Sequence, residues 1–154
     1  MNKACPFCSA EIENQVFLGT ESLMAVYNIA PILPGHSMVI PRRHVETIFD
    51  LNENELAEMF RFSRKVTELL MKVFDCEGFD WSLQESEAAG QSVAHLHLHI
   101  IPRKPGDLAR PGDWYAQLEE QRRSAMIDSP GRRPLSSDEI KHVITFIKKS
   151  SWLT

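Results

Sequence analysis

The sequence predicts a single α+β domain in which an antiparallel sheet packs against helices. Its 154 residues, 43% of them hydrophobic, are enough to build one ordinary core. Glycine and proline interrupt the chain at irregular intervals, so no repeat architecture is indicated. Strand-like runs and helix-like patterns occupy separate stretches between these breaks, which is typical of an antiparallel sheet. We therefore expect one domain over residues 1–154.

Four strands are expected from short apolar runs bounded by turn residues. Residues 22–28 and 37–41 carry partly alternating apolar side chains, and the Pro-Gly pair at 34–35 marks part of the turn that joins them. Residues 80–84 and 94–101 are two further candidate strands. A sheet built from them needs helices to cover it, and the sequence supplies these.

The clearest helix is expected over residues 52–74. Asn52 can cap its N-terminus and Glu55 occupies the third helical position, a combination typical of a capping box. Residues 114–125 and 138–149 are two further candidate helices. Apolar residues recur at three- and four-residue spacing along the long helix, which should lay one stripe on the sheet: Leu56, Met59, Phe60, Val66, Leu69, Leu70, Val73 and Phe74.

Charge and cysteine content restrict the class of protein. The formal net charge is −4 and the sequence pI is about 5.9, so no overall positive field is available to hold a long nucleic acid. No stretch approaches the ~18–20 apolar residues of a membrane span, and residues 1–7 show no apolar run of signal-peptide length. Three cysteines argue against a disulfide framework and suit a reducing compartment. A cytoplasmic protein without a membrane partner is the expectation.

Three histidines alternate with apolar residues in the segment 95–99, which reads His-Leu-His-Leu-His. On a strand, alternate side chains point to opposite faces, so His95, His97 and His99 would share one face while the leucines face the core. One interpretation is an exposed polar face, and another is a metal site made by the triad alone. Same-face neighbours lie about 6.6–7 Å apart, which suits a single metal ion poorly.

Nucleophilic catalysis is the third interpretation of the triad, and it gives each ring a task. A neutral imidazole can attack phosphorus, while the flanking rings orient it, share protons with a leaving group and donate to phosphoryl oxygens. His97 is the best-placed nucleophile because it has a neighbour on either side. The preceding segment, Gly90-Gln91-Ser92-Val93, has the composition of an ordinary loop, but its place beside the triad predicts that Gln91 and Ser92 contact a phosphate or a leaving group.

The N-terminal segment Cys5-Pro6-Phe7-Cys8 has the Cys-x-x-Cys spacing that lets two thiolates bind one Zn²⁺. It is half of a tetrahedral site, which needs two further ligands. A redox pair is the weaker alternative, because no strand precedes Cys5 to build a thioredoxin-like unit. Cys76 is interpreted as an incidental residue at a helix end.

Residues 90–103, Gly-Gln-Ser-Val-Ala-His-Leu-His-Leu-His-Ile-Ile-Pro-Arg, resemble the signature of the histidine triad (HIT) family. The resemblance covers most of residues 22–120. It implies a five-stranded antiparallel sheet with helices, paired across a two-fold axis into a homodimer with a continuous sheet. The Ile-Pro-Arg ending and the Lys-Pro-Gly-Asp that follows look more like the fragile histidine triad branch, the dinucleoside polyphosphate hydrolases, than the nucleoside phosphoramidases.

The resemblance also implies roles for individual residues. His97 is the nucleophile at the α-phosphate, His99 contacts that phosphate, and His36 is an additional histidine near it. Tyr115 falls in a segment similar to a mobile loop of this branch, although packing beside Trp114 explains it equally well. The residues expected to bind substrate are Asn28, at the ribose, with Gln84, Gly90, Gln91, Ser92, Val93 and His99.

The Cys-x-x-Cys pair resembles half of a zinc arrangement found in many bacterial members of the family, with His44 and His95 as the other two ligands to join Cys5 and Cys8. Such a zinc ion is structural, because it would pin the N-terminal segment to the sheet and orient the triad strand. Whether a divalent cation accompanies the polyphosphate is left open. Arg103 and Lys104 can help to hold a polyphosphate, although a solvated loop explains them equally well.

These observations predict a nucleotide hydrolase or transferase that acts through a covalent nucleotidyl-histidine, with diadenosine tri- or tetraphosphate as the expected substrate. A nucleoside phosphoramidase or nucleotidyl transferase would use the same intermediate, and a nucleotide-sensing module with slow turnover would use the same pocket. A zinc-bound interaction domain would need no chemistry at His97. Beyond residue 120 the chain matches nothing in the family, so we expect a core over about residues 5–120 and a helical extension over 121–154.

Overall fold

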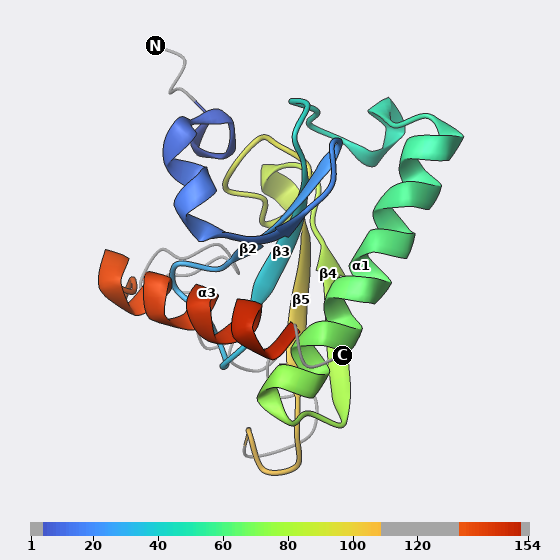
Figure 1. The fold of residues 1–154 in the computed structure, drawn as a ribbon. Helices are drawn as coiled ribbons and strands as arrows, with labels where there is room; N and C mark the ends of the chain where they lie inside the picture. Colours follow the sequence, from blue (N-terminus) through green and yellow to red (C-terminus); the bar gives the residue numbers. More distant parts are fainter. Residues whose placement is uncertain (1–4, 109–132, 152–154) are drawn as a thin grey trace.

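The computed structural model describes residues 5–108 and 133–151 and contains a five-stranded sheet (Figure 1). The strand order is β1-β2-β3-β5-β4, and every neighbouring pair is antiparallel. The expected α+β fold is confirmed. The strands are β1 (Val16–Gly19), β2 (Leu23–Tyr27), β3 (Ser37–Pro41), β4 (Gly78–Leu83) and β5 (Leu98–Arg103).

The long helix α1 (Glu53–Phe74) begins with the expected capping box. The side-chain oxygen of Asn52 accepts hydrogen bonds from the backbone N–H groups of Asn54 and Glu55, at 2.9 and 3.0 Å, and Glu55 Oε2 accepts from the Asn52 N–H at 2.9 Å. These bonds satisfy backbone donors that have no partner inside a helix. The helix ends where Asp75 adopts a left-handed conformation with φ 53°.

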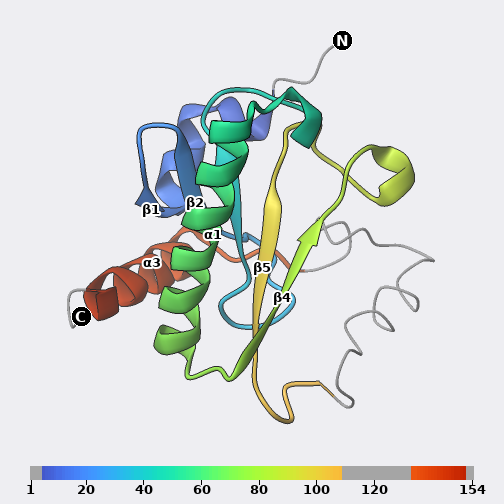
Figure 2. The same cartoon turned by 90° about the vertical axis from the view of Figure 1, so that its right-hand side faces the viewer.

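The two faces of the sheet have different partners. Helices α1 and α3 (Ser137–Ser151) lie against each other on one face, as the two views show (Figures 1 and 2). The expectation of a helix over 138–149 is confirmed, and its isoleucines belong to the main core. That core includes Ala25, Tyr27, Val39, Val66, Leu70, Leu96, Leu98, Ile100, Ile140, Ile144 and Ile147. The alternate residues of β2 and β3, which point to the other face of the sheet, form a second apolar cluster with the N-terminal segment. Its members are Ile12, Met24, Val26, Met38 and Ile40, with Phe7 and Val16 packed against them.

The strand expected over residues 94–101 is displaced, because β5 begins only at Leu98 and continues to Arg103. The backbone N–H of His95 donates to the Val93 carbonyl at 2.8 Å, and that of Leu96 donates to the Val45 carbonyl at 2.6 Å. These bonds hold the chain before Leu98 in an irregular path. His95 and His97 therefore precede the regular ladder, and only His99 lies within it.

Three short elements at the N-terminus were not expected from the sequence: the 3-10 helices η1 (Pro6–Cys8) and η2 (Ala10–Gln15) and the strand β1. β1 has four residues, and its pairing with β2 shifts register between Val16 and Leu18. A segment this short presents too few side chains for a periodic pattern to stand out.

The turn between β2 and β3 is fixed by a glycine. Gly35 has φ 89°, and a Cβ atom there would lie 2.9 Å from Pro102 Cγ and 3.0 Å from Phe74 Cδ2. Its N–H donates to the Tyr27 hydroxyl at 3.1 Å. The neighbouring Ile29 carbonyl accepts from the Leu135 N–H at 2.6 Å, so the segment before α3 is tied to the same turn.

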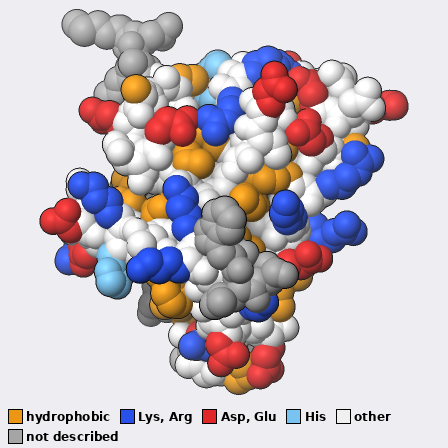
Figure 3. Space-filling view, in the orientation of Figure 1, with side chains coloured by type: hydrophobic (Ala, Val, Ile, Leu, Met, Phe, Trp, Pro, Cys, Tyr) orange, Lys and Arg blue, Asp and Glu red, His pale blue; other side chains and the backbone are white. Residues whose placement is uncertain are grey.

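Some expectations lie outside the described residues, including the helix over 114–125 and the position of Tyr115. The single domain over residues 1–154 stays a prediction for the same reason. None of the described helices is long and apolar enough to cross a membrane. On the face drawn in Figure 3, Lys and Arg side chains are interspersed with Asp and Glu side chains.

Candidate functional site

The three triad rings are buried, with 0% of His95, 1% of His97 and 0% of His99 exposed. The interpretation of the triad as an exposed polar face is therefore wrong. In the ladder, His99 lies opposite Met38 of β3 and Ser82 of β4. The intervening Leu96, Leu98 and Ile100 belong to the main core, as expected.

A backbone carbonyl fixes the protonation pattern of His97. Its Nδ1 atom lies 2.7 Å from the carbonyl oxygen of His95, which can only accept a hydrogen bond. Nδ1 therefore carries the proton, and the neutral ring keeps its lone pair on Nε2. The unprotonated nitrogen of a neutral imidazole is the atom that can attack phosphorus.

A second chain of hydrogen bonds orients His99. The backbone N–H of Ile32 donates to His36 Nδ1 at 3.1 Å, so the neutral His36 ring carries its proton on Nε2. His36 Nε2–H donates to His99 Nδ1, and the two nitrogens lie 3.0 Å apart. The Nε2 atom of His99 is then the protonated one and can donate to a phosphoryl oxygen. The His97 and His99 rings lie edge to face, with centroids 4.9 Å apart.

Three residues expected to bind substrate line one cavity of about 460 Å³: Asn28, Ser92 and Val93. This volume lies within the ~300–1,000 Å³ range of ligand pockets. Asn28 is buried, its Oδ1 accepts from the Ala30 N–H at 2.8 Å, and its Nδ2 lies 3.5 Å from His36 Nε2. Asn28 therefore lies between the cavity and the histidine chain.

Gln84 and Gly90 lie against each other. A Cβ atom at Gly90, where φ is 99°, would come within 3.1 Å of Gln84 Nε2, so the backbone approaches the amide closely. Gln84 Oε1 is buried and has no hydrogen-bond partner within residues 5–108 and 133–151. A buried acceptor of this kind needs a donor, which a bound ligand or water supplies.

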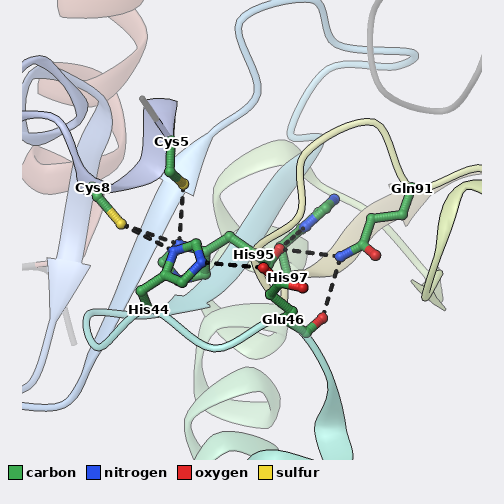
Figure 4. A network of polar contacts seen from close by, with 7 residues as sticks. All are labelled: Cys5, Cys8, His44, Glu46, Gln91, His95 and His97. Carbon is green, nitrogen blue, oxygen red and sulfur yellow. Dashed lines mark hydrogen bonds and ion pairs between the residues drawn. The ribbon is translucent and has the colours of Figure 1, made fainter. Parts of the chain in front are cut away.

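Gln91 supports the chain that carries the triad (Figure 4). Its Oε1 accepts from the Ser86 N–H at 2.8 Å, and its Nε2 donates to the carbonyl oxygens of Glu46 and His95, both at 3.5 Å. The side chain therefore links three backbone segments. Its contact with substrate stays a prediction.

Cys5, Cys8, His44 and His95 come together as the sequence predicts (Figure 4). Their ligand atoms all lie within 4.8 Å of one another. The Nδ1 atom of His95 is 3.4 Å from Cys5 Sγ and 3.6 Å from Cys8 Sγ, and that of His44 is 3.3 Å from Cys8 Sγ. Zn–S bonds of ~2.3 Å and Zn–N bonds of ~2.0–2.1 Å require S···N separations of about 3.6 Å in a tetrahedron. The cluster fits a zinc ion.

Groups around this cluster set the protonation of its ligands. His95 Nε2 lies 2.8 Å from the Pro41 carbonyl oxygen and must donate to it, which leaves Nδ1 unprotonated on the side of the cysteines. Burial lowers the pKa of His95, so its ring is neutral. His44 Nε2 lies 3.7 Å from Glu46 Oε1. Burial and the neighbouring Cys5 raise the pKa of the Cys8 thiol, so metal binding must displace its proton.

Arg103 is engaged in structural ion pairs. Its guanidinium donates to Asp80 Oδ2 at 2.7 Å and to both carboxylate oxygens of Asp107, at 2.8 and 2.9 Å. The hydrogen bonds that Arg103 donates to Asp107 lower the pKa of Asp107 and raise the pKa of Arg103. Arg103 therefore holds the turn after β5, and it is not a mobile cation.

Two contributors to the site escaped the sequence analysis. Phe7 places its ring edge-on to both His95 and His97, and Ile32 orients His36 through its backbone. The position of Phe7 between the two cysteines of the Cys-x-x-Cys motif could have indicated its place beside the site. No side-chain pattern marks the second, because the donor is a main-chain N–H.

The sequence matches the HIT domain family over residues 9–106. It is 40% identical over 120 residues to the bis(5'-nucleosyl)-tetraphosphatase [asymmetrical] of Schizosaccharomyces pombe, covering 78% of this chain and 66% of that protein. It is 33% identical over 110 residues to the bis(5'-adenosyl)-triphosphatase of Dictyostelium discoideum, covering 71% and 74%. The solved NitFhit protein of Caenorhabditis elegans superposes with a TM-score of 0.70 at 25% identity, covering 89% of this chain and 27% of that one. The chain belongs to the HIT domain family.

The Asp107 carboxylate should stabilise the fold in a pH-dependent way. Replacing Asp107→Asn should lower the free energy of unfolding at pH 7 by about 1–3 kcal/mol, because a charge-assisted bidentate contact is lost. Since the folded-state pKa lies below the ordinary value of 3.8, this stabilisation is present above that value and disappears as the pH falls through the folded-state pKa.

Urea unfolding of the two proteins at pH 7 and near pH 3 measures this difference. Asp138→Asn is the control, because Asp138 is 96% exposed and its ion pair with Lys141 is long, at 3.9 Å. This change should lower the free energy of unfolding by no more than about 0.3–1 kcal/mol, the contribution of a carboxylate in the first turn of a helix. A difference for Asp107→Asn that is equally large at both pH values would contradict the assignment.

Proposed function

We propose that the chain is a dinucleoside polyphosphate hydrolase in which His97 attacks the α-phosphate. The observation that carries this proposal is the hydrogen bond from His97 Nδ1 to the His95 carbonyl, which leaves the attacking lone pair on Nε2. The names of the Schizosaccharomyces pombe and Dictyostelium discoideum relatives support the substrate class.

The reaction has two displacements. His97 Nε2 forms an N–P bond to the α-phosphorus while the P–O bond to the departing nucleotide breaks. Water then attacks the same phosphorus, releases a nucleoside monophosphate and restores the imidazole. Throughout, His99 Nε2–H donates to an oxygen of the α-phosphate, and His36 keeps His99 in the tautomer that can do so.

The remaining substrate contacts belong to the same proposal. Asn28, Ser92 and Val93 bind the nucleotidyl part in the cavity that they line. Gln84 offers its buried Oε1 to a substrate donor, and Gly90 and Gln91 shape the loop beside it.

His97→Asn should lower turnover of diadenosine tetraphosphate by more than about 10³-fold, because the nucleophile is removed. Intact-protein mass spectrometry after rapid quenching should show an acid-labile nucleotidyl adduct on the unmodified protein and none on the variant. His142→Asn, on the exposed side of α3, is the matched control and should leave both unchanged. An unaltered rate in His97→Asn would contradict the mechanism. Bound nucleotide with no adduct and no product would favour a sensing module.

We also propose that Cys5, Cys8, His44 and His95 hold a structural zinc ion. The fit of their S···N separations to a tetrahedral ion supports this assignment. When bound, the ion would cross-link the N-terminal turn to the end of β3 and to the triad segment.

Metal analysis tests the zinc proposal directly. The purified chain should contain one equivalent of zinc, and Cys8→Ser should lose most of it. Cys76→Ser, which removes the cysteine outside the cluster, should retain one equivalent. Chelation should lower the unfolding temperature of the unmodified chain by about 5–15 °C, because the ion binds the folded state. Full zinc content in Cys8→Ser would rule out this ligand set.

A homodimer with a continuous sheet is the proposed assembly. β4 is an edge strand, and an aromatic group of Phe60, Phe79 and Trp81 adjoins it, with ring centroids 5.6–5.9 Å apart. Phe60 is 42% and Phe79 47% exposed, which is unusual for paired aromatic rings unless another surface covers them.

Sedimentation equilibrium should give the mass of two chains. Phe79→Glu should shift the population towards one chain, because a charge would be buried in the interface. Phe49→Glu replaces the most exposed of the described phenylalanines, which lies in the 3-10 helix Ile48–Asp50 and outside the aromatic group, and should leave the dimer intact. A monomer mass for the unmodified chain would overturn the proposal.

A further inference from the structure

Phe7 lies between the two candidate metal ligands of the N-terminal turn and touches the nucleophile. Its ring centroid is 5.8 Å from that of His95 and 5.3 Å from that of His97, with interplanar angles of 68° and 74°. Both contacts have the edge-to-face geometry that aromatic rings prefer. One side chain therefore contacts a ring of the metal cluster and the ring that attacks phosphorus.

Phe7 also forms part of the wall of the cavity that contains Asn28, Ser92 and Val93. Its neighbours Pro6 and Ser9 line the same cavity. The N-terminal turn thus contributes one side of the space, while the sheet and the loop before the triad contribute the other. A shift of this turn would change the shape of the cavity.

Little besides the cysteine ligands fixes the turn. The helix η1 has three residues, and its backbone bonds are Cys8 N–H to the Cys5 carbonyl at 3.1 Å and Ser9 N–H to the Pro6 carbonyl at 3.4 Å. A single 3-10 turn is unstable alone. The Ser9 hydroxyl also donates to the Pro6 carbonyl at 3.0 Å. The other restraints are contacts of the Phe7 ring itself, with the two histidines and with the second apolar cluster. Metal bonds at Cys5 and Cys8, on either side of Phe7, would immobilise the ring.

We propose that Phe7 is a positioning residue that couples metal binding at Cys5, Cys8, His44 and His95 to nucleotide binding at the triad. With zinc bound, the ring is held against His97 and completes the cavity wall; without zinc, the turn moves and nucleotide affinity falls. This inference rests on the proposed function, because it takes the cavity to be the nucleotide site. The coupling is reciprocal, so nucleotide must strengthen zinc binding by the same factor.

The test measures zinc affinity by competition with a chelator, in the presence and absence of AMP, for the full chain. In the unmodified protein, saturating AMP should tighten zinc binding about three- to tenfold, the range expected for the loss of one or two aromatic contacts. In Phe7→Ala the factor should fall below about twofold, although one equivalent of zinc still binds. Phe7→Tyr keeps the ring edge and should restore the coupling. Phe49→Ala, at an 89% exposed phenylalanine, should behave as the unmodified chain.

The readout remains valid if the chain unfolds without zinc. If AMP and zinc were coupled only because both stabilise the folded chain, AMP would tighten zinc binding by the same factor in the unmodified protein and in Phe7→Ala. Equal factors in the two proteins would therefore overturn the proposal. A factor near one in the unmodified chain would also overturn it. The covalent mechanism can fail separately. If no adduct forms at His97 but the coupling is present and needs Phe7, this inference still stands. If AMP does not bind the unmodified chain, this inference is wrong, and the adduct experiment still decides the covalent mechanism.

Discussion

The carbonyl group of His95 is the constraint on which the site depends. It accepts from His97 Nδ1 at 2.7 Å and from Gln91 Nε2 at 3.5 Å, while the ring of the same residue bonds to the Pro41 carbonyl and meets the cysteines. The opposite tautomer of His97 would forfeit a buried hydrogen bond, at a cost of about 1–3 kcal/mol. In the proposed mechanism the ring is therefore prepared for attack before substrate arrives, so no reorganisation is needed at the moment of reaction.

Burying four imidazoles beside a core is expensive unless each has partners, and the backbone supplies many of them. The carbonyls of Pro41 and His95 accept from two rings, and the Ile32 N–H donates to a third, His36. A regular strand through residues 94–97 would direct its main-chain groups into ladder bonds. The irregular path before β5 leaves the His95 carbonyl available to the His97 ring.

Elements with strong local signals could be predicted, and α1 is the clearest case. The cap at Asn52 predicts where this helix begins, and the spacing of its apolar residues predicts which of its faces is buried. The strand β3 likewise has the expected bounds. The prediction of a strand over 94–101 was wrong at its start. The alternating side chains indicated a strand, but the hydrogen bond from the Leu96 N–H to the Val45 carbonyl holds the backbone there in an irregular path. Within the site, the Cys-x-x-Cys spacing identified Cys5 and Cys8, and the resemblance to bacterial family members supplied His44 and His95. Neither could identify Phe7 or Ile32, which act through a ring edge and a main-chain N–H.

Main-chain and side-chain functions are divided at residue 95. The imidazole belongs to the metal cluster, but the acceptor for the nucleophile is the carbonyl, which every amino acid carries. A substitution at this position during evolution would abolish a metal ligand and leave the acceptor in place. Under the two proposals, loss of the metal ligand at residue 95 would leave the tautomer of His97 unchanged, so the metal site and the protonation pattern of the nucleophile can vary independently.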